Sequence, residues 1–155
     1  MNRISHPFLY FFVLAGTLFI LVSSAGSMLW GNAAPGQLHW TEQLFYGVCH
    51  RLPDRTYQIG GAFMAVNTRC FGIFAGLFAG WLFMPVYGRY TAGRRWPLLF
   101  LLTAAVFQIV DYVGNLLEIW QNTLHSRALL GALFGFALPV AIADLFINQK
   151  QMNKT

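Results

Sequence analysis

Long apolar stretches alternate with short polar segments along the whole chain. Four of the stretches carry at most one charged side chain each. Each is close to the length of about 20 residues with which an α-helix crosses a bilayer. Lipid offers the backbone no hydrogen-bond partners, so each stretch is expected to be helical. The predicted spans are residues 8–30, 62–84, 96–117 and 128–147, followed by a polar tail over residues 148–155.

The first span and the loop after it carry signals of their own. Small residues at positions 23–26 resemble a signal-peptide cleavage site, but the apolar run before them is longer than a signal peptide usually has. We therefore interpret it as a retained span. In the loop, Thr41 as N-cap and Glu42 in the first turn predict a short helix through Val48 that lies in the membrane interface. Pro53 prevents its easy continuation.

The composition agrees with a membrane protein and excludes a soluble domain. Apolar residues make up 57% of the 155 residues and charged residues 10%, against about 25% charged residues in soluble domains. The net charge of +5 does not indicate a nucleic-acid partner, because the basic side chains are scattered at span ends. We predict an all-α fold with one membrane domain over residues 1–155. It is an integral membrane bundle of four transmembrane helices in the lipid bilayer, with a short interfacial helix in the first outer loop.

The distribution of Lys and Arg predicts the orientation of the spans, because basic residues favour the cytoplasmic side. Six of them group on the side of the two termini and four on the other side. The first group is Arg3, Arg89, Arg94, Arg95, Lys150 and Lys154, and the second is Arg51, Arg55, Arg69 and Arg127. We predict a multi-pass protein of the cell membrane with both termini in the cytoplasm.

Glycines recur at every fourth residue in two of the spans. The second span carries Gly72, Gly76 and Gly80, and the fourth span carries Gly131 and Gly135. Such rows let another helix approach closely. The rows therefore predict tight helix packing, either within this chain, with other membrane subunits or by self-association.

Polar side chains inside the spans require partners, because an unpaired charge in the hydrocarbon core is costly. Arg69 projects from the glycine stripe of the second span, facing either the bundle interior or, by snorkelling, the interface. Asp111 on the third span either serves a function or forms an ion pair that fixes helix register. The predicted ligand or ion-pair site comprises Arg55, Arg69, Asp111, Asn115 and Arg127.

Cys49, His50 and Cys70 lie around the start of the second span. As a metal site they offer three ligands for zinc or another transition metal, with a carboxylate or water as the fourth. As a disulfide, the two cysteines would tie the loop to the span, a closure worth roughly 3 kcal/mol. A thiol redox enzyme coupled to quinone is a third interpretation. The lack of a Cys-x-x-Cys motif counts against it.

The order of these motifs resembles a known family. The chain carries Cys-His-x-x-Pro-x-Arg-Thr at 49–56, Arg-Cys-x-Gly at 69–72, the aspartate at 111 and Arg-x-x-x-Gly-x-x-x-Gly at 127–135. These motifs are similar to those of the small bacterial and archaeal membrane proteins catalogued as domain of unknown function 2085, and the resemblance covers most of the chain. It implies no particular activity.

The chain departs from the family pattern at one position. The pattern usually places a further cysteine two residues before the arginine, which implies a tetrahedral zinc set of three cysteines and one histidine. Asn67 stands there in this chain and supplies no thiolate.

The function predicted from the sequence is that of a small polytopic membrane protein with an outer-side Cys, His, Arg and Asp site. The site binds a metal ion or an anion, in transport or as a subunit of a complex. A non-enzymatic role is favoured, since no glycine-rich phosphate loop or His-Glu-x-x-His motif occurs. The alternatives are the quinone-coupled thiol enzyme, and a structural Cys49–Cys70 disulfide beside arginines that bind a phospholipid headgroup.

Overall fold

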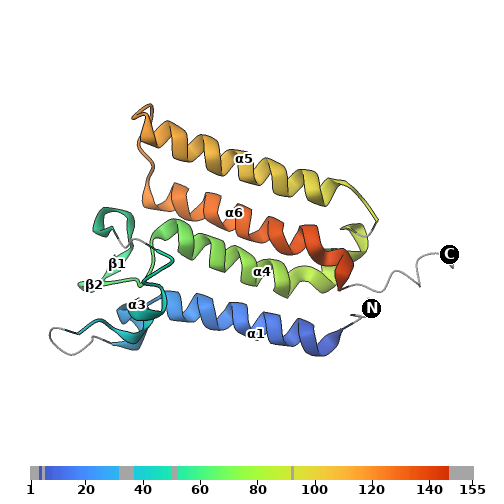
Figure 1. Ribbon diagram of the computed structural model, residues 1–155, viewed down its shortest axis with the longest axis horizontal. Helices are drawn as coiled ribbons and strands as arrows, with labels where there is room; N and C mark the ends of the chain where they lie inside the picture. The colour runs from blue at the N-terminus through green and yellow to red at the C-terminus, as the bar shows by residue number, and fades with distance from the viewer. Residues whose placement is uncertain (1–3, 5, 32–36, 50–51, 92, 147–155) are drawn as a thin grey trace.

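The computed structural model describes residues 4, 6–31, 37–49, 52–91 and 93–146. Within these residues, four helices are long and apolar enough to cross a membrane. They are α1 (Pro7–Ser24), α4 (Thr68–Thr91), α5 (Trp96–Leu116) and α6 (Leu124–Ile142). The predicted all-α, four-span fold is thereby confirmed. The helices lie side by side in one row, in the order α5, α6, α4, α1 (Figure 1).

The start and end of several spans differ from the prediction, and glycines explain two of the differences. The first span ends at Ser24, because Gly26 adopts a φ of 63° and starts the short helix α2 (Ser27–Trp30). A small hairpin of β1 (Gln58–Ile59) and β2 (Ala62–Phe63) occupies the predicted start of the second span. Gly60 and Gly61, with φ of 59° and 82°, form the hairpin turn between the two strands.

The fourth span starts earlier than predicted, at Leu124. The Thr123 side chain caps it, since the Ser126 backbone N–H donates to Thr123 Oγ1 at 3.1 Å. The helix gives way at Ile142 to the 3-10 turn η2 (Ala143–Leu145). Residue 147 of the predicted span and the predicted tail over 148–155 lie outside the described residues.

The short helix of the first loop, α3 (Trp40–Leu44), is present but is capped by a different residue. His39 is the N-cap, and its Nδ1 accepts from the Thr41 backbone N–H at 3.4 Å. In return, Glu42 Oε2 accepts from the His39 backbone N–H at 3.3 Å, which completes a capping box. Turns follow α3 over residues 45–48, where the helix was predicted to continue, and Pro53 opens the 3-10 helix η1 (Pro53–Arg55).

The α4–α6 pair forms the centre of the row, and the glycines lie in its contact. A Cβ atom on Gly72 would be 2.0 Å from the Ala128 carbonyl oxygen, and one on Gly135 would be 2.1 Å from that of Ile73. Cβ atoms on Gly76 and Gly131 would meet carbonyl oxygens of the partner helix at 2.1 and 2.3 Å, and one on Gly80 would meet the Pro139 side chain at 2.8 Å. Any side chain would therefore force the two backbones apart. The rows are thus used within this chain.

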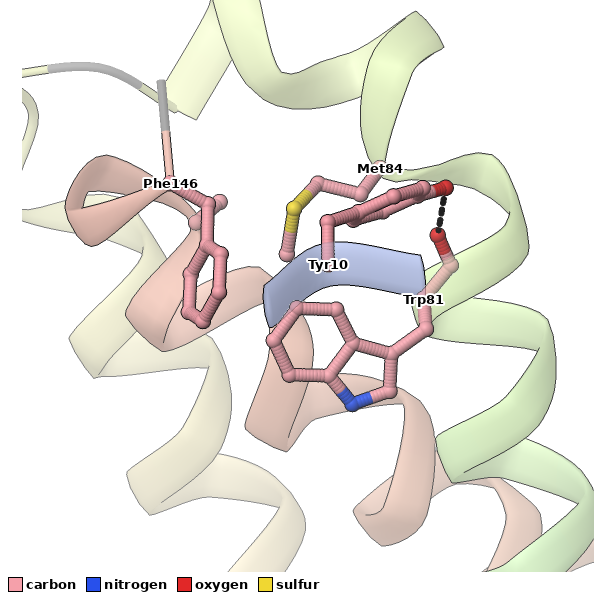
Figure 2. Packing of buried hydrophobic residues seen from close by; sticks show 5 residues of the cluster. Tyr10, Trp81, Met84 and Phe146 are labelled. Carbon is pink, nitrogen blue, oxygen red and sulfur yellow. Dashed lines mark hydrogen bonds between the residues drawn. The ribbon is translucent and has the colours of Figure 1, made fainter. Parts of the chain in front are cut away.

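An aromatic cluster joins α1 to the central pair near the chain termini. Tyr10 Oη donates to the Trp81 carbonyl oxygen at 2.9 Å, and the Trp81 and Phe146 rings meet edge to face with centroids 4.8 Å apart (Figure 2). Met84 and Ala143 complete the buried cluster. The cluster stabilises the end of the row opposite to the loop that carries Cys49 (Figure 1).

Candidate functional site

An ion pair between α4 and α5 forms the base of the site. Arg69 Nη2 donates to Asp111 Oδ2, and the two side chains are only 24% and 11% exposed. Of the two alternatives for Arg69, the structure thus has the one in which its guanidinium faces the protein interior. The pairing offsets the cost of placing either charge inside a membrane-spanning segment.

The loop between α5 and α6 folds back over this ion pair. Asn122 Nδ2 donates to Asp111 Oδ2 at 2.7 Å, and the Asn122 backbone N–H donates to Asn115 Oδ1 at 3.2 Å. The Trp120 indole packs directly on Gly114, where a Cβ atom would come within 2.0 Å of the ring. Sequence reasoning missed Asn122, because a polar residue in a short loop carries no signal of burial.

Arg127 completes a network of polar residues around the ion pair. Its Nη2 donates to Asn115 Oδ1 at 3.2 Å, so the same amide oxygen accepts from both Arg127 and Asn122. Arg69, Asp111, Asn115 and Arg127 of the predicted site are therefore brought together. The hydrogen-bond partner of Arg127 is a neutral amide, which leaves its positive charge without compensation from that bond.

A cavity of about 440 Å³ opens beside this network. Residues of α4, α5, α6 and the first loop line it. They are Arg55, Asn67, Thr68, Arg69, Cys70, Tyr112, Asn115, Leu116, Glu118 and Arg127. The lining thus holds three guanidinium groups and one carboxylate, that of Glu118. The predicted Arg55 lies in the same lining as Arg69 and Arg127.

The Arg55 guanidinium has only a weak partner of its own. Its Nε lies 3.4 Å from Asp54 Oδ2, and the two side chains are 41% and 71% exposed. An exposed pair of this kind contributes little, typically 0–1 kcal/mol. Of these two ion pairs, only that of Arg69 with Asp111 is largely buried.

The Cys49 thiol meets the Cys70 thiol, and Cys70 is the one of the two that lines the cavity. The Cys49 and Cys70 sulfur atoms lie 3.4 Å apart without a disulfide bond between them. Cys49 is 7% exposed and accepts a hydrogen bond from the Asn67 backbone N–H at 3.2 Å. Cys70, in the first turn of α4, lines the cavity. The structural disulfide considered from the sequence is not formed.

Asn67 holds the first loop in position. Its Oδ1 accepts from the Leu52 backbone N–H at 3.2 Å and lies 3.1 Å from Thr56 Oγ1. The loop is tied once more where Thr68 Oγ1 donates to the Arg55 carbonyl oxygen at 3.2 Å. The asparagine side chain thus has a structural role that positions Arg55 at the cavity.

The structure does not support the predicted metal site. Across the part of the chain that the structure describes, no three His, Cys, Asp or Glu side chains lie close enough together to hold a metal ion. Cys49 and Cys70 are adjacent, but the third predicted ligand, His50, lies outside the described residues. The arginine-lined cavity is therefore the more complete candidate site.

These features define the class of protein. Four apolar helices that can cross a membrane, with a polar network between three of them at one end, characterise a multi-pass membrane protein. The comparison of sequences specifies the family. Residues 49–141 match the family described as "Predicted membrane protein (DUF2085)", and the chain belongs to it. The matched region runs from the first thiol through almost all of α6.

Two relatives are archaeal. An uncharacterized protein of Methanocaldococcus jannaschii is 28% identical over 104 residues, which cover 65% of this chain and 65% of that relative. The match thus spans slightly less than two thirds of that relative's length. An uncharacterized protein of Methanothermobacter thermautotrophicus is 41% identical over 99 residues, which cover 62% of this chain and 85% of the relative. No solved structure matches the chain.

Proposed function

We propose that this membrane protein binds an anion with phosphate or carboxylate chemistry in the arginine-lined cavity, in a role in transport or as a subunit of a membrane complex. The observation that carries the proposal is the convergence of Arg55, Arg69 and Arg127 on one cavity. Guanidinium groups recognise phosphate and carboxylate oxygens through paired hydrogen bonds. The cavity volume of about 440 Å³ lies in the usual range of small-molecule sites.

The charge balance favours an anion over a cation. Three guanidinium groups line the cavity together with one carboxylate, that of Glu118, and Asp111 pairs with Arg69 from outside the lining. Arg127 donates to an amide oxygen and Arg55 has an exposed partner, so the lining itself carries more positive than negative charge. A partly buried guanidinium group within a membrane-spanning segment, such as that of Arg127, is costly when its charge is uncompensated. A bound anion lowers that cost, and it would do so most strongly at Arg127.

The cavity suits both a dissolved anion and a lipid headgroup. Tyr112 and Leu116, which form part of its wall on α5, are 55% and 64% exposed on the surface that faces lipid. A phospholipid can therefore reach the arginines from the side while its chains remain in the bilayer. The ligand chemistry is the same in both cases, a phosphate or carboxylate group.

The orientation of the protein belongs to the same proposal. Basic residues favour cytoplasmic termini, which would place the cavity on the outer side of the membrane. Protease protection of tags fused to each terminus tests this point, and accessibility of either tag from outside intact cells would contradict it.

The test of anion binding uses purified protein in nanodiscs made of neutral lipid, titrated calorimetrically with inorganic phosphate. Arg127→Gln is expected to weaken binding at least about tenfold, equivalent to about 1.4 kcal/mol. Arg94→Gln is the matched control, because Arg94 is exposed at the opposite end of the helices. Equal phosphate affinity in wild type and Arg127→Gln would contradict the proposal for dissolved anions.

A second measurement separates the two sources of the anion. Native mass spectrometry of the detergent-purified protein detects phospholipid that remains bound. Retained lipid that is lost in Arg127→Gln but not in Arg94→Gln identifies a headgroup site. A site without lipid that binds free phosphate identifies a dissolved anion. If the protein binds neither phospholipid nor free phosphate, the proposed function is excluded.

A further inference from the structure

We propose that Cys49 and Cys70 form a dithiol that undergoes exchange with a small disulfide, and that the arginines of the same cavity select a disulfide carrying carboxylate groups. The inference rests on the proposed function in one respect, since the anion site supplies the selectivity. It adds a covalent activity to that site.

The positions of the two thiols give them different roles. Cys70 lines the cavity next to Arg69, so a molecule bound there can reach its sulfur atom. Cys49 is 7% exposed and lies behind it, with the two sulfur atoms 3.4 Å apart. Cys70 is therefore the thiol that attacks the substrate, and Cys49 is the thiol that resolves the product.

The exchange proceeds in two balanced steps. The Cys70 thiolate attacks one sulfur of the disulfide RSSR, the S–S bond breaks, and one RS⁻ leaves while a Cys70–S–S–R mixed disulfide forms. The Cys49 thiolate then attacks Cys70 Sγ, a Cys49–Cys70 disulfide forms, and the second RS⁻ leaves. The protons of the two thiols end on the two RSH products. The dithiol is oxidised and the small disulfide is reduced.

The surroundings of Cys49 support the second step. The Asn67 backbone N–H donates to Cys49 Sγ at 3.2 Å, and hydrogen bonds to the charged form of a group favour that form. Thiolates are the reactive species in exchange. The two sulfur atoms are 3.4 Å apart, so a small movement brings them to the length of about 2.05 Å of a disulfide bond.

The lining of the cavity indicates the chemical class of the substrate. Arg55, Arg69 and Arg127 line the same cavity as Cys70, and Glu118 is the one carboxylate in that lining, so positive charge is in excess there. A disulfide whose substituents carry carboxylates places them against these guanidinium groups while its sulfur atoms face Cys70. A cationic disulfide would be repelled.

The experiment compares three disulfides with the reduced, purified protein: oxidised glutathione with its carboxylates, neutral hydroxyethyl disulfide and cationic cystamine. Mass spectrometry follows the loss of the two protein thiols and the release of RSH. We expect a Cys49–Cys70 disulfide to form with two RSH released, and oxidised glutathione to react at least about tenfold faster than either other reagent. Equal rates for the three reagents would overturn the selectivity, and the absence of an internal disulfide would overturn the exchange itself.

Variants test the order of the steps. Cys49→Ser is expected to stop at the mixed disulfide on Cys70, while Cys70→Ser leaves Cys49 unreacted. Rapid reaction of Cys49 in Cys70→Ser would reverse the assignment and overturn the inference. Arg127→Gln should slow the glutathione reaction about tenfold more than it slows the hydroxyethyl disulfide reaction, and Arg94→Gln should slow neither. Size-exclusion profiles equal to wild type establish that each variant is folded.

The outcomes separate this inference from the proposed function. Phosphate binding that depends on Arg127, combined with unreactive thiols, would leave the anion site intact and overturn the exchange alone. Thiol exchange without charge preference, together with no bound anion, would overturn the proposed function and the charge selection while leaving the exchange itself. Unreactive thiols together with no bound anion would overturn both.

Discussion

Arg69 of α4 forms an ion pair with Asp111 of α5 although α6 lies between these two helices in the row (Figure 1). The close approach of α4 and α6 makes this possible, because Gly131 lets the α6 backbone lie against the Arg69 carbonyl, where a Cβ atom would be only 2.3 Å away. The Arg69 side chain then reaches past α6 to α5. One ion pair thereby links α4 to α5, the two spans on either side of α6.

Breaking this pair should destabilise the protein more than removing it as a whole. Asp111→Ala leaves a partly buried guanidinium without its carboxylate, and we expect a loss of about 3 kcal/mol of unfolding free energy. The double variant Arg69→Met/Asp111→Leu should recover most of that loss. Thermal unfolding in detergent measures both effects. If the double variant were as unstable as Asp111→Ala, the ion pair would stabilise the fold beyond neutralising its own two charges.

The glycine contact between α4 and α6 predicts a strong effect of one methyl group. A Cβ atom on Gly76 would lie 2.1 Å from the Ala132 carbonyl oxygen, so Gly76→Ala should cost at least about 3 kcal/mol by forcing the helices apart. Gly16→Ala on α1 is the control, because a Cβ atom there meets nothing within 4 Å. Similar unfolding temperatures of the two variants would contradict this packing.

The hydrogen bonds of Asn67 predict a loosened loop when its side chain is removed. Asn67→Ala deprives the Leu52 backbone N–H of its acceptor and removes the Asn67 Oδ1 contact of the Thr56 hydroxyl, which keeps the Leu52 carbonyl oxygen as acceptor, at a cost of about 1–2 kcal/mol. Maleimide labelling of Cys49 should become faster as the loop opens. Gln43→Ala, which removes a single exposed hydrogen bond to the Leu38 carbonyl, is the control. Unchanged labelling in Asn67→Ala would show that other contacts hold the loop.

Asn122 is expected to act on ligand binding through its neighbours. Asn122→Ala removes the donor to Asp111 and weakens the positioning of Asn115, the hydrogen-bond partner of Arg127. We expect the dissociation constant for phosphate to rise about tenfold, equivalent to about 1.4 kcal/mol. The neighbouring Gln121 is exposed, so Gln121→Ala should bind as wild type. Phosphate calorimetry in nanodiscs tests both variants, and wild-type affinity in Asn122→Ala would contradict a positioning role.

The sequence predicted the spans correctly but misplaced several of their ends. A span is recognised by the apolar length needed to cross a bilayer, which is a property of the stretch itself. The ends depend on backbone conformation instead. Gly26 and the Gly60–Gly61 pair adopt positive φ angles that end one helix and build a hairpin before the next. Apolar residues continue through both places, so hydrophobicity alone does not mark these turns.

The sequence predicted which residues belong to the candidate site better than it predicted the contacts between them. The cost of charge in a membrane indicates that Arg69 and Asp111 need partners, and their helical positions are visible in the sequence. Asn122 was missed because its burial results from a loop that folds back onto Asp111. The predicted metal set also depended on an arrangement in space that the described residues do not provide.

The sequence by itself therefore determined the four membrane-crossing helices and the residues that cannot face lipid alone, because transfer into a bilayer depends on each segment's own length and polarity. The tertiary structure decided the order of the helices, the pairing of Arg69 with Asp111 past α6, the meeting of the two thiols, and the cavity that Cys70 lines with three arginines. Those relationships join residues far apart in the chain. They arise only when the glycines of α4 and α6 allow the two backbones to touch.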